Sequence, residues 1–287
     1  MSKRIRKIIG HLKVNETSAV SLDILDGKSA LITGSTSGIG LSVAKALANK
    51  GCNVVITGFG DWEKAVKMVK SVAKYPSKVY YLNFDLNDVP EQPKLLVKES
   101  LKLLGNKIDI LVNNAGLQYV SKIEDFPDNK FELLLNVMLH SPFYLTKSVI
   151  PHMRKNKFGR IINISSAHGK RASPYKSGYC TAKHGIIGLT RVTALEMGLE
   201  RDINWTCNAV CPGWTETELA KAQVHTRAKN NKTTYNEEEY KLLSEKHGQV
   251  KWVQPNDVAS FVEYLCGNNA QQINGASLSI DAGWAAR

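Results

Sequence analysis

The stretch Thr33-Gly34-Ser35-Thr36-Ser37-Gly38-Ile39-Gly40 decides the fold of this 287-residue chain. It follows a short apolar run and opens a segment, 39–49, whose apolar residues recur at helical spacing. Gly34 permits a tight turn, Gly38 lets backbone N–H groups approach a ligand, and Gly40 lets helix and strand pack closely. Such a turn between a strand and a helix is typical of a dinucleotide pyrophosphate site, and a plain strand-to-helix turn is the alternative.

Short apolar runs alternate with helix-length amphipathic segments along the rest of the chain. The expected strands span 29–33, 53–57, 79–84, 108–112, 160–165, 203–210 and 276–280. The expected helices span 39–49, 61–74, 90–104, 128–155, 178–199 and 257–266. Near-continuous apolar strands between such helices indicate a parallel sheet covered on both faces, and right-handed crossovers make it a doubly wound, Rossmann-type α/β sheet.

Two parts of the chain depart from this alternation. Residues 1–27 are expected to form a basic N-terminal extension, because the first fourteen residues hold five Lys or Arg and no acid. Residues 28–287 show no internal repeat and no linker, so a single dinucleotide-binding domain is expected. Within it the segment of about 215–251 is polar, lysine-rich and interrupted, which favours a mobile flap over the substrate site.

The bulk composition restricts the possible partners and locations. No uninterrupted apolar run reaches about 18 residues, so no membrane span is expected. The net charge of +12 is spread without interleaved aromatic residues, so no nucleic-acid partner is expected, and no metal is expected either. Five cysteines without a C-x-x-C pair favour reduced thiols and a cytoplasmic location. The basic N-terminus leaves the mitochondrial matrix as the alternative.

A second constellation predicts proton transfer. Ser166 ends an expected strand, and Tyr179 and Lys183 are spaced i, i+4 on one helical face. A tyrosine holds its proton until about pH 10, and the neighbouring ammonium is expected to lower the pKa of the phenol. Tyr179 would then exchange a proton with an alcohol whose oxygen Ser166 aligns. A lone Y-x-x-x-K is common on solvated helices, but with the serine and the glycine turn it predicts hydride transfer to a nicotinamide.

The end of the second expected strand bears on the form of the dinucleotide. An acid at this position commonly holds the adenosine ribose, and a basic residue accommodates a 2′-phosphate. The stretch Ile56-Thr57-Gly58-Phe59-Gly60-Asp61 has no Arg or Lys at the strand tip. Phe59 would crowd a phosphate, although simple packing is the other interpretation of this side chain. The sequence therefore favours NAD over NADP.

The chain resembles the short-chain dehydrogenase/reductase family through motifs that occur in the family's order: the glycine turn, Asn113-Asn114-Ala115-Gly116, Ser166, Tyr179-x-x-x-Lys183 and Pro212-Gly213. The resemblance extends from about residue 28 to the C-terminus. It implies a homotetramer and a catalytic set of Ser166, Tyr179 and Lys183. The cofactor-binding residues that it implies are Gly34, Thr36, Ser37, Gly38, Ile39, Gly40, Phe59, Asp85, Leu86, Asn113, Ala115, Gly116, Tyr179, Lys183, Pro212 and Gly213.

Further motifs resemble the 3-hydroxybutyrate dehydrogenases of this family. They are Gly58–Asp61, Asn114–Gln118, Ser166–Gly169, Ser173–Ser177, Cys211–Trp214 and Asp281–Trp284. The resemblance implies NAD-dependent interconversion of (R)-3-hydroxybutyrate and acetoacetate. Such a small anionic hydroxy or keto acid needs a cation and several donors in a dry pocket. The substrate-binding residues that the resemblance implies are Gln118, Ser166, His168, Lys176, Tyr179, Trp214, Gln223 and Trp284.

One position departs from the family pattern. The family usually has an asparagine that steadies a water of the proton relay, and an ungapped alignment places Met138 there, whose thioether donates no hydrogen bond. Asn136 lies about 200° away round the helix and is expected to face elsewhere. Met138 therefore keeps open a dinucleotide-binding protein with weakened catalysis. The other alternative is a same-fold reductase of a larger carbonyl, such as a steroid or a carrier-bound ketoacyl group.

Overall fold

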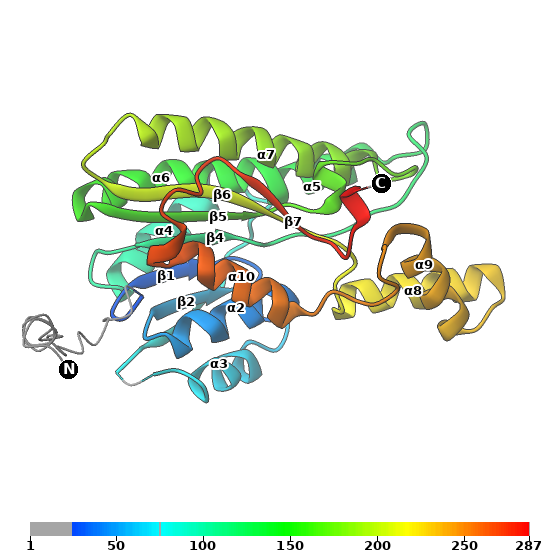
Figure 1. Cartoon of the computed structure of the whole chain (residues 1–287), viewed down its shortest axis with the longest axis horizontal. Coiled ribbons are helices and arrows are strands. Elements are labelled where there is room, and N and C mark those ends of the chain that lie inside the picture. Colours follow the sequence, from blue (N-terminus) through cyan, green and yellow to red (C-terminus); the bar gives the residue numbers. More distant parts are fainter. Residues whose placement is uncertain (1–24, 75, 287) are drawn as a thin grey trace, which may run out of the picture.

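Seven parallel strands form one sheet in the computed structural model, which describes residues 25–74 and 76–286 (Figure 1). The strands are β1 (Ser29–Ile32), β2 (Asn53–Thr57), β3 (Val79–Leu82), β4 (Ile110–Asn113), β5 (Phe158–Ile164), β6 (Asn204–Pro212) and β7 (Ser277–Ile280). Their order is β3-β2-β1-β4-β5-β6-β7, so the winding direction reverses between β1 and β4. Doubly wound sheets bind ligands at the carboxyl edge of this switch point. The predicted fold class is confirmed.

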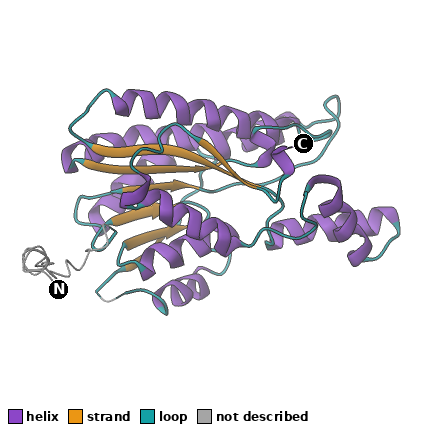
Figure 2. Ribbon diagram, in the orientation of Figure 1, coloured by secondary structure: helices purple, strands orange, loops and turns teal. Residues whose placement is uncertain are grey.

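Helices cover both faces of the sheet (Figure 2). They are α2 (Gly38–Asn49), α3 (Trp62–Lys70), α4 (Glu91–Leu103), α5 (Asp128–Leu135), α6 (Ser141–Asn156), α7 (Ser177–Gly198), α8 (Glu218–Asn231), α9 (Tyr235–Lys246) and α10 (Pro255–Cys266). Short helical turns are η1 (Asn136–His140), η2 (Ala167–Gly169), η3 (Asn268–Ala270) and η4 (Trp284–Ala286). The helices α2, α3 and α10 share one apolar core with the sheet, and α4, α6 and α7 share the other.

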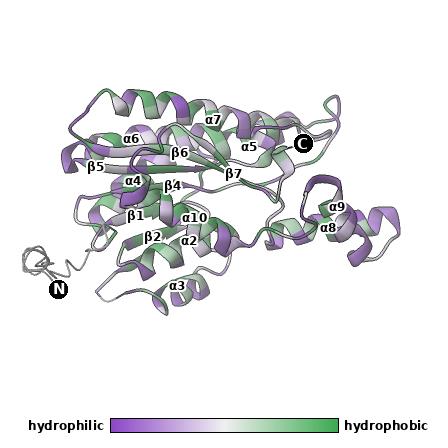
Figure 3. Cartoon of the chain, viewed as in Figure 1, coloured by the Kyte–Doolittle hydropathy of each residue, from purple (hydrophilic) through white to green (hydrophobic). Residues whose placement is uncertain are grey.

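Side chains of the strands alternate between these two cores. In β1, Ala30 and Ile32 join the core under α2 and α10, whereas Leu31 joins the core under α4 and α6. Successive residues of a strand point to opposite faces, and both faces of this sheet are covered. The central strands are therefore mainly apolar, although β5 and β6 also bury polar side chains such as Arg160 and Asn208, and Figure 3 shows the hydrophobic colour along much of the sheet.

The single helix that the sequence predicts over 128–155 is divided into α5, the π-helical turn η1 and α6. The backbone N–H of Ser141 donates to the carbonyl of Asn136, five residues earlier. Single π-helical turns inside α-helices occur frequently at functional sites. This one holds Met138 at its centre, so the position that departs from the family pattern is also one of irregular backbone.

The segment expected to be a flap contains two helices, α8 and α9, which project beside the sheet (Figure 1). Thr217 and Thr234 cap their N-termini with side-chain hydrogen bonds. Between the helices lies the carboxylate of Glu238, a residue that is 1% exposed, and it accepts hydrogen bonds from Arg227, Asn231 and Thr233. This network joins α8 to α9 as one unit, and the mobility of that unit stays a prediction.

The N-terminal extension lies largely outside the described residues, so its structure and its role as a targeting signal stay predictions. No helix within 25–74 and 76–286 is long and apolar enough to cross a membrane. The same part of the chain brings together no cluster of histidine, cysteine or acidic side chains that could hold a metal ion.

Candidate active site

The glycine-rich turn lies at the carboxyl end of β1, beside the switch point of the sheet. The backbone has positive φ at Gly34 (+61°) and at Gly38 (+53°), a conformation that favours glycine. A Cβ on Gly34 would lie 2.7 Å from the Cα of Ala115, and a Cβ on Gly38 would lie 3.1 Å from a methyl carbon of Thr217. The turn therefore tolerates no larger residue at Gly34, and its backbone stays open to close approach.

The start of α2 offers backbone N–H groups to a ligand in this turn. Its N-cap residue, Ser37, forms no side-chain cap hydrogen bond, and the first turn of the helix holds no acidic residue. The first N–H groups of a helix have no partner within the helix, and the helix dipole favours an anion beside them. A pyrophosphate satisfies both conditions, so the residues present fit a dinucleotide.

A cleft of about 1740 Å³ runs from this turn across the carboxyl edge of the sheet. The predicted cofactor-binding residues that line it are Gly34, Thr36, Ser37, Gly38, Ile39, Phe59, Asp85, Leu86, Ala115, Gly116, Tyr179, Lys183, Pro212 and Gly213. Two others lie behind its surface. A Cβ on Gly40 would overlap the carbonyl of Gly34, and Asn113 donates to Asn163 at 2.8 Å. Gly40 and Asn113 therefore support the cleft wall instead of lining it.

Asn114 belongs to the stretch Asn113-Asn114-Ala115-Gly116, which is expected to lie along the cofactor, and it lines the cleft. Its Nδ2 donates to the carbonyl oxygens of Thr33 and Gly34, each at 2.9 Å. The hydroxyl of Thr33 in turn accepts the backbone N–H of Asn114 at 2.9 Å. These bonds fasten the end of β4 to the glycine turn across the switch point. The sequence offered one signal for this role, namely an asparagine directly after an expected strand, whose side-chain amide can bond to backbone groups nearby.

The adenosine end of the cleft is shaped by the loop after β2. Phe59 is 70% exposed and lines the cleft, so it is not a core residue. The phenol of Tyr81 donates to the carbonyl of Gly58 at 2.9 Å, and this bond anchors the loop to β3. Among the described residues that line the cleft, Lys183 is the sole Lys or Arg, and it lies in the catalytic group.

Ser166, Tyr179 and Lys183 meet where the cleft joins a smaller pocket. Ser166 follows β5, and Tyr179 and Lys183 lie in the first two turns of α7. The hydroxyl of Ser166 accepts the backbone N–H of His168 at 3.1 Å and is hydrogen-bonded to the phenol of Tyr179. The ammonium of Lys183, 4% exposed, donates to the carbonyl of Ile164 at 2.7 Å and lies 5.7 Å from the centroid of the Tyr179 ring.

The pKa of Tyr179 differs from the lowered value that its spacing to Lys183 led us to expect. Burial raises the pKa of Tyr179 to about 12, and the hydrogen bond from Ser166 opposes this shift. Burial also lowers the pKa of Lys183 to about 8. The net shift at the phenol is therefore opposite to the expected lowering, and Lys183 is not among its causes. The ammonium donates to a backbone carbonyl, and loss of hydration is the largest cause of the shift at the phenol.

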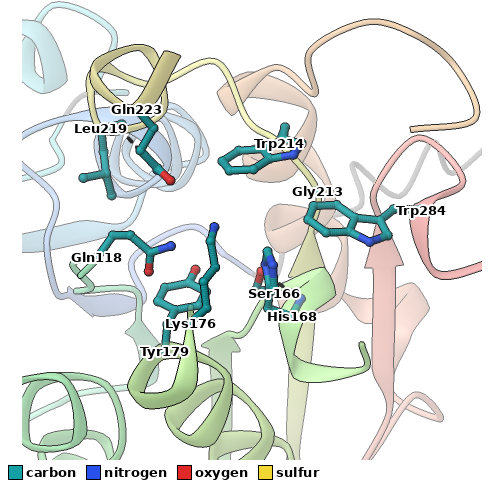
Figure 4. A pocket seen from close by; sticks show the side chains of 10 residues that line it. All are labelled: Gln118, Ser166, His168, Lys176, Tyr179, Gly213, Trp214, Leu219, Gln223 and Trp284. Atoms are coloured by element: carbon teal, nitrogen blue, oxygen red, sulfur yellow. Dashed lines mark hydrogen bonds between the residues drawn. The ribbon is translucent and has the colours of Figure 1, made fainter. Parts of the chain in front are cut away.

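The smaller pocket, of about 350 Å³, opens beside Tyr179 and is drawn in Figure 4. All eight predicted substrate-binding residues line it: Gln118, Ser166, His168, Lys176, Tyr179, Trp214, Gln223 and Trp284. Gly213 and Leu219 complete its wall. Leu219 was missed because α8 was not predicted. On that helix Leu219 and Gln223 are spaced i, i+4 and therefore share one face.

A cation lies in this pocket without an acidic partner among the described residues. The ammonium of Lys176 points toward Trp214 and lies 4.6 Å from the centroid of its ring (Figure 4). Burial is the largest cause that lowers the pKa of Lys176, to about 8. Burial and the charge of Lys176 also lower the pKa of His168 to about 3, so the imidazole is neutral. Lys176 is thus placed to meet a negatively charged group.

The other walls combine apolar surface with unpaired polar atoms. The rings of Trp214 and Trp284 stack with centroids 6.0 Å apart, and the ring of His168 meets Trp284 edge-on at 4.7 Å. The Oε1 of Gln118 and the Nε1 of Trp214 are buried without a hydrogen-bond partner. Buried polar atoms normally have partners, so these two indicate where a ligand binds. The pocket therefore suits a small molecule with one anionic and one apolar end.

Comparison with known proteins agrees with this geometry. The family profile described as short chain dehydrogenase matches residues 28–228. The chain belongs to the short-chain dehydrogenase family. It is 40% identical over 264 residues to a D-beta-hydroxybutyrate dehydrogenase of Cupriavidus necator, covering 92% of this chain and 100% of that protein. It is also 40% identical over 261 residues to the D-beta-hydroxybutyrate dehydrogenase of Rhizobium meliloti, covering 91% of this chain and 99% of that one.

A solved structure extends the comparison to three dimensions. The L-sorbose reductase of Gluconobacter frateurii, complexed with NADPH and L-sorbose, superposes with a TM-score of 0.84 at 26% identity. The match covers 91% of this chain and 98% of the reductase. This short-chain dehydrogenase is therefore an oxidoreductase whose cofactor is a nicotinamide dinucleotide.

The short-chain dehydrogenase keeps an apolar surface where the family usually has its relay asparagine. Met138 is buried in a cluster with Leu134 and Ala182, and Tyr179 packs against that cluster. As predicted, Asn136 faces elsewhere, and its amide bonds to Asn87 at 3.3 Å and to His140 at 2.9 Å. The thioether of Met138 cannot donate a hydrogen bond, so a relay in this protein depends on backbone groups or takes another route.

Proposed function

We propose that this short-chain dehydrogenase is an NAD-dependent (R)-3-hydroxybutyrate dehydrogenase that interconverts 3-hydroxybutyrate and acetoacetate. The observation that carries the proposal is the unpaired ammonium of Lys176 in a small pocket beside the hydroxyl groups of Ser166 and Tyr179. The substrate has a carboxylate at one end and a hydroxyl two carbons away. Two relatives named as D-beta-hydroxybutyrate dehydrogenases support the same assignment.

Binding of the acid follows from the chemistry of the pocket walls. The carboxylate accepts a charge-assisted hydrogen bond from Lys176 and further bonds from the amides of Gln118 and Gln223. The methyl end lies against the indole rings of Trp214 and Trp284, where apolar surface is removed from water. Specificity arises because a neutral substrate would leave the Lys176 ammonium buried without a partner.

Proton transfer uses Ser166, Tyr179 and Lys183, which lie where the cofactor cleft meets the substrate pocket. Bound NAD⁺ supplies the hydride acceptor and a positive ring that favours ionisation of a nearby phenol. Ser166 holds the substrate oxygen, and Tyr179 takes the hydroxyl proton during oxidation and returns it during reduction. The ammonium of Lys183 stabilises the phenolate that forms once the site is closed to water.

Three further properties belong to the proposal. The exposed ring of Phe59 and the lack of a basic residue near it, among the described lining residues, support NAD over NADP. A homotetramer follows from the family resemblance. A cytoplasmic location, with the mitochondrial matrix as its alternative, follows from the sequence.

An assay of NADH formation tests the proposed function. The purified full chain is mixed with NAD⁺ and either (R)- or (S)-3-hydroxybutyrate, and absorbance of NADH is followed. We expect turnover of the R enantiomer with NAD⁺ and slower turnover with NADP⁺. Faster reduction of a neutral steroid or a carrier-bound ketoacyl group than of acetoacetate would replace the proposal with the larger-carbonyl alternative. Tight NADH binding without turnover of any alcohol would support the weakened dinucleotide-binding protein.

The KM for 3-hydroxybutyrate is expected to rise with pH. The pKa of Lys176 is about 8, so the cation that binds the carboxylate is lost as the pH rises through that value. Above it, KM increases by up to about tenfold for each pH unit. Steady-state kinetics between pH 6.5 and 9.5 measure the change, and the Lys176→Ala variant serves as the control. A KM that stays constant over this range, or the same rise in the variant, would contradict the assignment of Lys176.

A further inference from the structure

His247 is buried and lines neither the cofactor cleft nor the substrate pocket. It nevertheless contacts Trp214 and Trp284, two residues of the pocket wall. It is 0% exposed and follows the last residue of α9. Its Nε2 accepts the backbone N–H of Trp214 at 2.9 Å, and its Nδ1 bonds to the carbonyl of Lys251 at 2.8 Å. Its ring lies 6.0 Å from the ring of Trp284.

Three chain segments meet at this side chain. The first leaves the sheet through Trp214 toward α8, and the second returns from α9 through Lys251 to Val253. The two are paired, because Val253 donates to the carbonyl of Trp214 at 2.9 Å. The third is the C-terminal segment that carries Trp284. It is tied to the second, since the N–H of Gly248 donates to the carbonyl of Ala282 at 2.7 Å.

The partners of His247 fix its tautomer. A carbonyl only accepts hydrogen bonds, so Nδ1 carries the proton, and Nε2 must be unprotonated to accept the N–H of Trp214. Each ring nitrogen therefore has one directional bond to a different segment. The fit to Gly213 is also close, because a Cβ there would lie 2.6 Å from Nε2. Gly213 lines both the cofactor cleft and the substrate pocket.

We propose that His247 is a positioning residue that holds Trp214 and Trp284 in place and so limits the length of the acid that the pocket accepts. The inference rests on the proposed function, which names the acid. His247 touches no ligand and acts through the backbone of Trp214 and the ring of Trp284. Since Lys176 lies over the ring of Trp214, a shift of that backbone also moves the indole against which the cation packs.

Two substitutions separate positioning from simple packing. His247→Leu fills the space but makes neither hydrogen bond, leaving a buried N–H and a buried carbonyl unpaired. We expect the KM for (R)-3-hydroxybutyrate to rise about tenfold, with a much smaller change in kcat. The preference for the four-carbon acid over (R)-3-hydroxyhexanoate falls in the same variant. His247→Gln keeps an acceptor at the ε position for the N–H of Trp214 as well as a donor, and it is expected to restore most of both values.

A matched control measures the effect of lost stability alone. Leu101→Ala opens a cavity in the core under α4, away from both cavities of the active site. Thermal unfolding by circular dichroism compares it with His247→Leu. We expect Leu101→Ala to lower the Tm without changing KM or chain-length preference. If His247→Leu does not fold, His247→Asn replaces it, because its shorter amide cannot reach both partners.

Tryptophan fluorescence gives a readout that does not depend on the substrate. We expect acrylamide to quench His247→Leu more strongly than the parent protein or His247→Gln, and this gain to become smaller in a Trp284→Phe background, in which Trp214 remains. If the parent protein does not oxidise 3-hydroxybutyrate, the proposed function fails, while this arm still tests His247. Unchanged quenching together with unchanged chain-length preference in His247→Leu, or equal KM changes in Leu101→Ala, would overturn the proposal.

Discussion

Replacing Tyr179 by phenylalanine is expected to lower kcat for 3-hydroxybutyrate oxidation by about 10²- to 10⁴-fold. The substitution removes the oxygen that we propose exchanges a proton with the substrate, and it keeps the ring. That ring packs against the cluster of Leu134, Met138 and Ala182 and meets His168 edge-on, 5.8 Å between centroids. These contacts survive the substitution, so the fold and the dinucleotide site are preserved. Initial rates of NADH formation measure kcat, and fluorescence titration measures the Kd for NADH.

Tyr119→Phe is the matched control for this experiment. Tyr119 packs against the same apolar cluster as Tyr179, but it lines neither the cleft nor the substrate pocket. Loss of its hydroxyl is expected to leave kcat unchanged. A Tyr179→Phe protein that keeps more than a tenth of the parent kcat would show that another group takes the proton. A large rise in the Kd for NADH would instead show that the substitution acts on cofactor binding.

Motifs that lie far apart in the sequence meet at one edge of the sheet because its strands are parallel. The turn after β1, the asparagine stretch after β4 and Ser166 after β5 each follow an apolar run in the sequence. In a parallel sheet all such ends lie on the same side, so strand order was not needed to expect that they meet. All seven strands lie where they were predicted, β2 with the predicted limits 53–57 and the others with ends shifted by one or more residues.

The helices α8 and α9 could not be predicted in the same way. Neither presents a strong apolar face to the sheet, so their sequence lacks the periodicity that reveals a packed helix. Much of what holds them together is the polar network around Glu238 and Arg227, which alternation of apolar residues does not reveal. Leu219 was missed for this reason. His247, one histidine in a polar segment, gave no sign that it is buried.

Two other features depend on surroundings that a motif does not contain. The stretch around Met138 is as apolar as the helices on either side, so the π-helical turn leaves no mark in its composition. The pKa of Tyr179 was predicted from its spacing to Lys183, but burial decides it, and burial is a property of the packed domain. The spacing predicted that Tyr179 and Lys183 lie close together, as they do, but the net pKa shift of Tyr179 has the opposite sign to the expected one.

Replacing Lys176 by alanine is expected to lower kcat/KM for 3-hydroxybutyrate by about 30- to 5000-fold. This range corresponds to the cost of about 2–5 kcal/mol for removing one partner of a buried, hydrogen-bonded charge pair. In the proposed function Lys176 binds the carboxylate, which does not react, so this contact is expected to be the same in the ground state and the transition state. Most of the loss therefore appears as a higher KM. Steady-state kinetics with NAD⁺ at saturation measure both constants.

The same variant separates the small-acid dehydrogenase from a reductase of bulky carbonyl compounds. A neutral steroid makes no bond to the ammonium, so its turnover is expected to change little when Lys176 is removed. Lys170→Ala is the matched control, because Lys170 bonds to Ser279 at 2.9 Å and lines neither cavity. It is expected to leave kcat/KM for the acid unchanged. An equal loss in Lys170→Ala would attribute the effect to the overall positive field. Unchanged acid turnover in Lys176→Ala would show that the carboxylate binds elsewhere.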